Sequence, residues 1–166
     1  IGPNMAKRIV DKFGKDALDV IEENPEALLS INGLGPKTVE KIAKSYRESR
    51  EFTKISLALA EYGIQLAQAV KIYKLYGDKS LEVVEENPYT LVEDIYGISF
   101  SKADEIAGKI GIESESGFRI KSGIKYALSV FSNSGSTYVP KDILLESAIK
   151  LLDISSELIE QNLTTL

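Results

Sequence analysis

The residues of this chain best suited to bind a ligand lie in a short glycine turn at residues 31–36. Glycine permits positive φ and close approach of the backbone, and N–H groups at the start of a helix attract anions together with the helix dipole. Leu34 stands between two glycines, as an apolar plug between two helices would, and a lysine follows the turn. The turn therefore predicts a phosphate site, whose candidate residues are Gly33, Leu34, Gly35, Lys37, Thr38 and Lys41.

Two further turns are built in a similar way. In the turn at residues 96–100, Ser99 replaces the second glycine, and in the turn at residues 62–66 the corresponding residue is Gln65. Because glycine is common in tight helix–helix turns that hold no ligand, all three turns also fit a purely structural role. We take a second set of candidates from the turn at 96–100, namely Gly97, Ile98, Ser99 and Lys102.

Enzymatic chemistry has little support in the sequence. The chain contains no cysteine and no histidine, which excludes zinc sites built on these residues, thiol catalysis and a histidine base. The Glu-Glu pairs at residues 22–23 and 85–86 lie side by side on predicted helices, where neighbouring side chains do not converge. Residues 33–38 mimic the end of an ATP-binding P-loop, but that motif follows a buried strand, and a predicted helix stands there instead. We therefore expect no catalytic residues and no metal ligands.

Charge is unevenly distributed along the chain. The 20 Lys and Arg and 25 Asp and Glu give a net charge of −5, which argues against a general polycation. Residues 1–50 carry +1, residues 51–111 carry −4 and residues 112–166 carry −2. A site for a polyanion is therefore expected as a local patch in the N-terminal third. The sequence lacks an apolar run long enough to span a membrane, and its lack of cysteine fits a reducing compartment, so we expect a cytoplasmic protein with no membrane partner.

An internal repeat organises the sequence. Residues 14–25 resemble residues 77–88, and aligning the chain with itself at an offset of 63, which becomes 64 after one insertion, gives 15 identities over residues 1–43. We expect residues 4–43 and 67–107 to fold as related helical units. A predicted helix at 51–62 precedes the second copy, so the repeat implies a similar helix ahead of residue 1. We therefore expect the sequence to be a fragment of a longer protein.

The pattern changes after about residue 112. Helices are predicted at 116–132, 140–152 and 155–163, with a short strand at 137–139. This order is typical of a winged-helix module whose wing would begin near residue 166. The predicted domains are 1–50, the first unit, truncated at its N-terminus; 51–112, the second unit; and 113–166, a truncated winged-helix-like bundle.

The turn pattern apolar-x-Gly-apolar-Gly resembles the helix-hairpin-helix motif, which implies an all-α fold of tandem, duplicated helix-hairpin-helix units followed by the incomplete bundle. The duplicated hairpins, with Gly97-Ile-Ser-Phe-x-x-Ala-Asp104 and Thr137-Tyr-Val-Pro140, further resemble the N-terminal region of RecD-like DNA helicases (RecD/TraA-type, exodeoxyribonuclease V alpha-chain-like) across nearly all 166 residues.

This resemblance implies a non-catalytic, sequence-independent DNA-binding module that contacts DNA phosphates through hairpin backbone amides, in a protein of DNA repair and recombination. It implies that the partners are DNA and downstream motor domains of the same chain. The parent would be an ATP-dependent 5′-to-3′ DNA helicase that uses ATP and Mg, whereas this fragment would need no cofactor. A monovalent cation at a hairpin is also compatible with the resemblance.

Two other functions remain to be compared with DNA binding. The acidic charge after residue 51 fits a protein-interaction or spacer module that positions the helicase motor and has degenerate hairpins. A helix-hairpin-helix glycosylase fits least, because such enzymes carry a catalytic acid directly after a hairpin, and no Gly-Pro-Asp follows any turn here.

Overall fold

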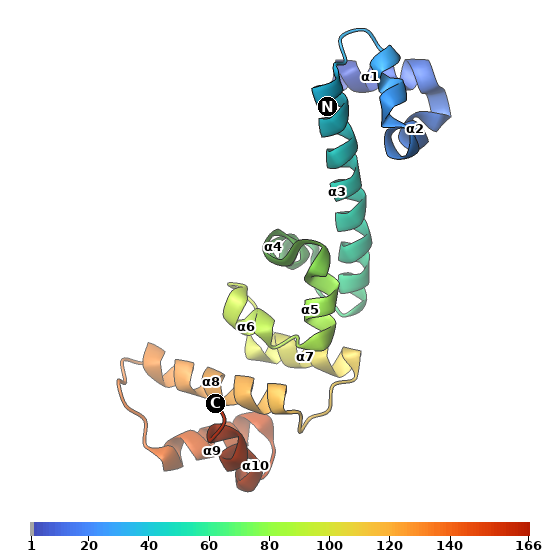
Figure 1. The fold of residues 1–166 in the computed structure, drawn as a ribbon. Helices are drawn as coiled ribbons and strands as arrows, with labels where there is room; N and C mark the ends of the chain where they lie inside the picture. The colour runs from blue at the N-terminus through green and yellow to red at the C-terminus, as the bar shows by residue number, and fades with distance from the viewer. Residues whose placement is uncertain (1) are drawn as a thin grey trace. The chain divides into compact units, whose positions relative to one another are not determined.

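The computed structural model describes residues 2–166, which form helices joined by short turns (Figure 1). Within that range there is no β-strand, so the all-α prediction is confirmed. The elements are α1 (Pro3–Phe13), η1 (Gly14–Asp16), α2 (Ala17–Glu23), η2 (Pro25–Ser30), α3 (Pro36–Glu61), α4 (Leu66–Tyr76), η3 (Gly77–Lys79), α5 (Ser80–Glu86), α6 (Thr90–Asp94), α7 (Phe100–Ile110), α8 (Gly117–Asn133), α9 (Lys141–Leu152) and α10 (Ser156–Leu163), where η marks a 3-10 helix.

The internal repeat is visible in the order of the elements. In the first copy α1, η1 and α2 follow one another, and α4, η3 and α5 repeat them at the predicted offset of 63. The glycines that end α1 and α4 have nearly the same backbone angles, with φ 57° and ψ −130° at Gly14 and φ 60° and ψ −132° at Gly77. Because each copy then leads through a glycine turn into α3 or α7, the predicted duplication is confirmed.

Helix α3 corrects one prediction from the sequence. A separate helix was expected at residues 51–62, but the chain runs as one helix of 26 residues from Pro36 to Glu61. Residues 37–61 contain no glycine or proline, so nothing interrupts the hydrogen-bond ladder once Pro36 has begun it. Lys44 and Glu48, which are one turn apart, form an ion pair at 3.9 Å that adds a little support.

The chain divides into two compact units, Ile1–Lys54 and Ile55–Leu166, whereas the sequence suggested three domains. Residues 113–166 belong to the second unit because α7 and α8–α10 share one core. Phe100 and Ala107 on α7 are buried with Ile120 and Ile124 on α8. The segment that was expected to follow the second hairpin as its own domain therefore packs directly onto it.

The C-terminal bundle consists of α8, α9 and α10, which pack on one another. Ser116 and Ser155 cap the first turns of α8 and α10 with their side-chain oxygens, as serine does at helix starts. The expected strand at residues 137–139 is not formed, and this stretch is irregular. A strand needs a partner to pair with, and no other segment of residues 2–166 offers one. In the same range no helix is long and apolar enough to cross a lipid bilayer.

Candidate nucleic-acid interface

Hairpin one, the turn at residues 31–35, is a tight glycine turn that leads into α3. Gly33 has φ +86°, a value that L-residues other than glycine rarely adopt. The Leu34 N–H donates to the Ile31 carbonyl at 3.1 Å. The Leu34 side chain is 5% exposed and lies in the core of the first unit. The turn is therefore anchored from inside by Leu34, which leaves its glycines at the surface.

Within residues 2–166, two amides of hairpin one lack a partner, whereas the third, that of Leu34, already donates to the Ile31 carbonyl. Gly35 precedes α3, and its carbonyl accepts the first hydrogen bonds of the helix from Thr38 and Val39, each at 3.0 Å. Among the residues that the structure describes, the N–H groups of Gly33 and Gly35 have no acceptor. A Cβ placed on Gly35 would meet no described atom within 4 Å. Two unpaired donors at the N-terminus of a long helix can thus be reached from outside, and such donors favour phosphate.

Basic side chains surround these amides. Lys37 and Lys41 are exposed on the first turns of α3, and neither forms an ion pair within residues 2–166. Thr38 is exposed beside them. From α1, the Arg8 guanidinium donates to the Asn32 carbonyl within the turn, and the Lys12 ammonium donates to the Ser30 carbonyl at 2.7 Å. Four basic residues thus lie at or near hairpin one, one bound to a carbonyl of the turn and one to the carbonyl just before it: Arg8, Lys12, Lys37 and Lys41.

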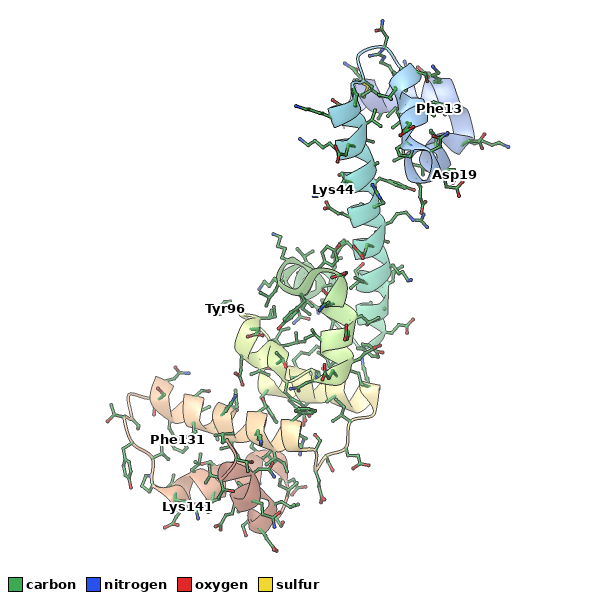
Figure 2. All side chains as sticks on the ribbon, viewed as in Figure 1. Phe13, Asp19, Lys44, Tyr96, Phe131 and Lys141 are labelled. Atoms are coloured by element: carbon green, nitrogen blue, oxygen red, sulfur yellow. The ribbon has the colours of Figure 1, made fainter. Side chains whose placement is uncertain are left out.

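Hairpin two, the turn at residues 95–99, repeats this backbone closely. Gly97 has φ +97°, and Ile98 replaces Leu34 as a core residue that is 5% exposed. The Ile98 N–H donates to the Ile95 carbonyl at 3.1 Å. The Lys71 ammonium donates to the Tyr96 carbonyl at 2.8 Å, as Arg8 does to Asn32. Figure 2 shows the Tyr96 side chain standing away from the ribbon, and it is 94% exposed.

The two hairpins differ at the third residue of the turn and in the helix that follows. The Ser99 side chain accepts from the Lys102 N–H at 3.3 Å and caps α7, where hairpin one has a bare glycine. The Lys102 ammonium forms an ion pair with Glu105 at 2.8 Å, and this hydrogen bond lowers the pKa of Glu105. The ammonium also lies 3.6 Å from the Cβ position of Gly63. The Lys102 ammonium thus lies beside Glu105 and Gly63, and its role at hairpin two stays a prediction.

Hairpin three, the turn at residues 62–65, has its amides occupied. The Gln65 N–H donates to the Gln68 side chain at 3.2 Å, which closes a capping box at the start of α4. The Gly63 N–H donates to Ala60 at 2.9 Å, and the Ile64 N–H donates to Leu59 at 3.1 Å. This turn therefore serves as a helix connection, with the Lys109 ammonium lying beside Gly63.

A monovalent cation at a hairpin, which the sequence left open, stays a prediction. Basic side chains donate to the carbonyl oxygens of Ser30, Asn32 and Tyr96 near these turns. The Ile31 carbonyl accepts from Leu34. We assign no role to a bound cation here. No cluster of acidic residues that could hold a metal ion occurs within residues 2–166.

A partly buried polar cluster in the second unit is structural. Arg119 donates to both carboxylate oxygens of Asp104, at 2.7 and 3.0 Å, and to the Leu152 carbonyl at 2.9 Å. The Tyr89 hydroxyl donates to Asp104 at 2.6 Å. Burial alone would raise the pKa of Asp104, but the hydrogen bonds from Arg119 and Tyr89 outweigh it and lower that pKa. Burial and the bond to Asp104 raise the pKa of Tyr89. Every group is paired, so the cluster joins α7 to the C-terminal bundle.

Sequence reasoning did not assign Arg8, Lys12 or Lys71 to the hairpins. Arg8 and Lys71 occupy equivalent positions at the repeat offset of 63, and both donate to the residue before the turn glycine. A shared basic residue at matched repeat positions was the signal that could have identified them. Lys12 has Leu75 as its counterpart, so the repeat gave no such signal for it.

The chain has duplicated short helices, buried apolar residues in its turns, and positive-φ glycines ahead of α3 and α7. These features together define a tandem helix-hairpin-helix protein. The family comparison agrees: residues 48–138 match the model described as the ATP-dependent RecD2 DNA helicase HHH domain, and residues 1–48 match the SAM-like helix-hairpin-helix tandem. The first match covers more than half of the chain, which therefore belongs to the RecD2 helix-hairpin-helix domain family.

A curated relative supports this assignment. The ATP-dependent RecD2 DNA helicase of Deinococcus radiodurans is 27% identical over 142 residues. The matched region covers 85% of this chain and 20% of that protein. The chain thus spans about a fifth of the length of the curated relative that it matches.

Proposed function

We propose that this chain is a non-catalytic, sequence-independent DNA-binding module of a RecD-like DNA helicase, which contacts phosphates through the backbone amides of hairpin one. The observation that carries the proposal is the pair of unpaired N–H groups at Gly33 and Gly35, which precede a helix of 26 residues. Lys37 and Lys41 stand exposed on the first turns of that helix. Donors, helix dipole and cations all favour the same ligand, an exposed phosphate.

Contacts of this kind set the affinity but not the sequence preference. Phosphate oxygens are the same at every base pair, so a site made of amides and lysines positions DNA without reading it. Non-specific affinities are about 10⁻⁴ to 10⁻⁶ M at physiological salt and fall as salt rises. With a net charge of −5, this chain should bind at the weak end of that range.

The proposal includes the role of the module in its parent. A parent that resembles the RecD2 helicase would carry ATP-hydrolysing motor domains downstream, would use ATP and Mg, and would unwind DNA in the 5′-to-3′ direction. The module would contact strands that enter or leave this motor. By itself the chain should neither hydrolyse ATP nor cut DNA. DNA-stimulated ATP turnover by the purified chain would overturn this assignment.

The experiment that tests the proposal compares two charge reversals. Lys37→Glu places a negative charge beside the free amides, whereas Lys150→Glu makes the same change on α9, in the other unit. Fluorescence anisotropy with labelled single- and double-stranded DNA over a range of salt should show Lys37→Glu weakening binding about tenfold, equivalent to about 1.4 kcal/mol. For Lys37→Glu, the slope of log affinity against log salt concentration should fall by about 1. Lys150→Glu should bind DNA as the unmodified chain does.

A second function has specific support in the second unit. Hairpin three has its amides occupied, Lys102 is paired with Glu105, and residues 51–111 carry −4. These features favour a protein-interaction or spacer role for that region. If neither Lys37→Glu nor Lys150→Glu changes DNA affinity, the spacer role becomes the better explanation for the whole chain. If both lower affinity equally, net charge alone matters and hairpin one is not the site.

A further inference from the structure

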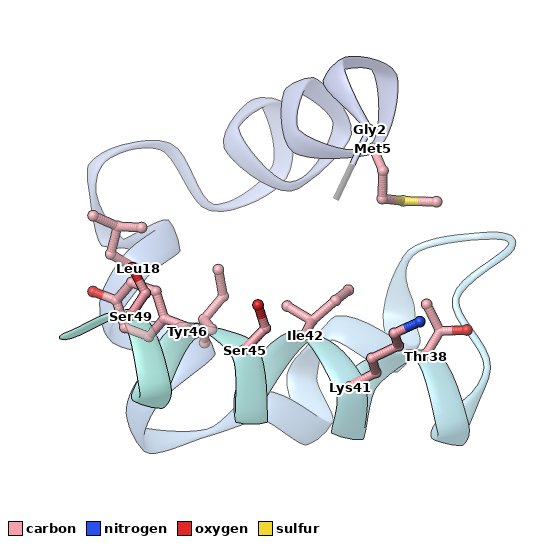
Figure 3. A pocket seen from close by; sticks show the side chains of 10 residues that line it. Gly2, Met5, Leu18, Thr38, Lys41, Ile42, Ser45, Tyr46 and Ser49 are labelled. Carbon is pink, nitrogen blue, oxygen red and sulfur yellow. The ribbon is translucent and has the colours of Figure 1, made fainter. Parts of the chain in front are cut away.

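The first unit contains an apolar groove between α1, α2 and α3, with a volume of about 600 Å³. Figure 3 shows Met5 and Leu18 on one side of it, and Ile42 and Tyr46 of α3 on the other, with Thr38 and Lys41 at the same face of α3. Leu18 is 56% exposed although it sits on the face of α2 that turns toward the groove. Exposure of this much apolar surface in one groove favours an apolar partner.

The second copy of the repeat shows what fills the equivalent place. The counterparts of Leu18, Ile21, Ile42 and Tyr46 are Leu81, Val84, Ile106 and Ile110. All four counterparts pack in one core cluster with Ile55 and Leu59, from the last turns of α3. Leu81 is only partly exposed there, and Val84 and Ile106 are fully buried.

Within residues 2–54 the first unit has no counterpart of Ile55 and Leu59. Its core cluster consists of residues between Met5 and Tyr46. Since Ile64 aligns with Ile1, the segment that corresponds to residues 51–63 would stand directly ahead of Ile1. The groove is thus the place that an amphipathic helix takes in the second copy.

We propose that the groove of the first unit is a docking surface for an amphipathic α-helix of the same polypeptide. This helix would stand in the same sequence position relative to Ile1 as residues 51–63 do relative to Ile64. The helix would present two aliphatic side chains one turn apart, as Ile55 and Leu59 do, toward Leu18, Ile42 and Tyr46. This proposal concerns the architecture of the first unit and does not depend on DNA binding.

A graft tests whether the groove accepts such a helix. A second copy of residues 51–63 is placed directly before Ile1, and a matched control carries lysine at the grafted positions that copy Ile55 and Leu59. Hydrogen exchange followed by mass spectrometry reports on α2 and the first turns of α3. The apolar graft should slow exchange in α2 at least tenfold and raise the melting midpoint of the first unit by about 5–10 °C, the shift that a tenfold gain in stability gives in a small domain. The lysine graft should do neither.

Leu18→Asn provides a second variant for the same question. Because Leu18 is largely exposed, this change should alter the stability of the ungrafted chain little. In the grafted chain it should remove most of the protection from exchange that the apolar graft gives. Equal protection by the apolar and lysine grafts, or no protection by either, would overturn the proposal. Concentration-dependent dimers of the unmodified chain in which α2 becomes protected would do so as well, because a second copy would then be the occupant.

Discussion

Hairpins one and two share a backbone but differ in what their surroundings do with it. Both have a glycine with φ near +90°, a core residue that is 5% exposed and a basic side chain on the carbonyl before the glycine. In hairpin one the helix that follows carries Lys37 and Lys41. The residues in the same places after hairpin two are Ser101 and Glu105. The duplicated scaffold has therefore been kept while its electrostatics diverged.

The helices that leave the two hairpins also have different neighbours. Glu40 on α3 is exposed, whereas its counterpart Asp104 on α7 is clamped by Arg119 of α8. Phe100 and Ala107 of α7 are buried against the C-terminal bundle. The second copy thus attaches the bundle, and the first copy keeps its turn open to a ligand.

The largest loss of stability should come from breaking the contact between α7 and the C-terminal bundle in the second copy. Arg119→Ala leaves the Asp104 carboxylate without its cation and the Leu152 carbonyl without a donor. Because the Arg119 side chain is only 12% exposed, the loss should be about 3 kcal/mol of the free energy of unfolding of the second unit. Hydrogen exchange should rise in α7–α9 and stay unchanged in α1 and α2.

A surface pair on α8 provides the matched control for Arg119. Lys125→Ala removes an ion pair with Glu93 in which both side chains are about half exposed, and it should cost less than about 1 kcal/mol. If both variants change exchange to the same degree, the Arg119 cluster is not what holds α7 to the bundle.

Protonation of Asp104 should weaken the same attachment more mildly. The pKa of Asp104 is lowered in the folded chain, so its contribution is present above the unfolded value of 3.8 and is lost as pH falls below it. Urea denaturation between pH 7 and pH 3, followed in the second unit, should show stability falling at the acid end. Asp104→Asn should be less stable at pH 7 and should lose less on acidification. If the stability of Asp104→Asn depends on pH as that of the unmodified chain does, protonation of Asp104 is not the cause of the loss at acid pH.

Glycine substitutions separate turn strain from ligand contact. Gly33→Ala and Gly97→Ala place a Cβ at positive φ, and each should cost about 1–2 kcal/mol of stability in its own unit. Gly35→Ala has neither positive φ nor a described atom within 4 Å of its Cβ, so folding should change little. DNA affinity should nevertheless fall with Gly35→Ala, because the methyl group stands where phosphate approaches. Thermal unfolding followed by circular dichroism measures the stability of the three variants, and fluorescence anisotropy measures their affinity for DNA.

The smallest effects should come from Arg8 and Lys71, the two basic side chains that donate to the carbonyl before a turn glycine. Arg8→Gln and Lys71→Gln each remove a charged hydrogen bond to a turn carbonyl, which is worth about 1 kcal/mol in either unit. Their stability losses should match, whereas only Arg8→Gln should also weaken DNA binding, by a few fold, because the helix after hairpin one carries Lys37 and Lys41 and the helix after hairpin two has Ser101 and Glu105 in those places. Equal losses of DNA affinity would show that both hairpins bind.

Much of the fold could be predicted from the sequence because it depends on local signals. The repeat, the glycine turns and the apolar residues Leu34 and Ile98 are all read from spacing along the chain. The strand at residues 137–139 was wrong because β-branched and aromatic residues indicate a strand only where a partner exists. The continuous α3 was missed because a separate helix was predicted at residues 51–62, although residues 37–61 contain no glycine or proline to interrupt a helix.

The site itself depends on contacts that spacing does not show. Arg8 reaches Asn32 across 24 residues, and Lys71 reaches Tyr96 across 25. The ammonium of Lys102 turns toward Glu105 and the neighbourhood of Gly63, although its backbone lies at hairpin two. These directions follow from how helices pack in three dimensions, so sequence reasoning could name the turn but not its full set of cations.

The most direct test of the central claim is an NMR titration of the backbone amides with DNA. The chain has 12 glycines, whose amide signals are few enough to follow individually in a ¹⁵N-labelled sample. Adding a short DNA duplex should shift the signals of Gly33 and Gly35 most, that of Gly97 less, and those of Gly63 and Gln65 least. If Gly33 and Gly35 stay in place while signals elsewhere move, phosphate does not bind at hairpin one and the account is contradicted.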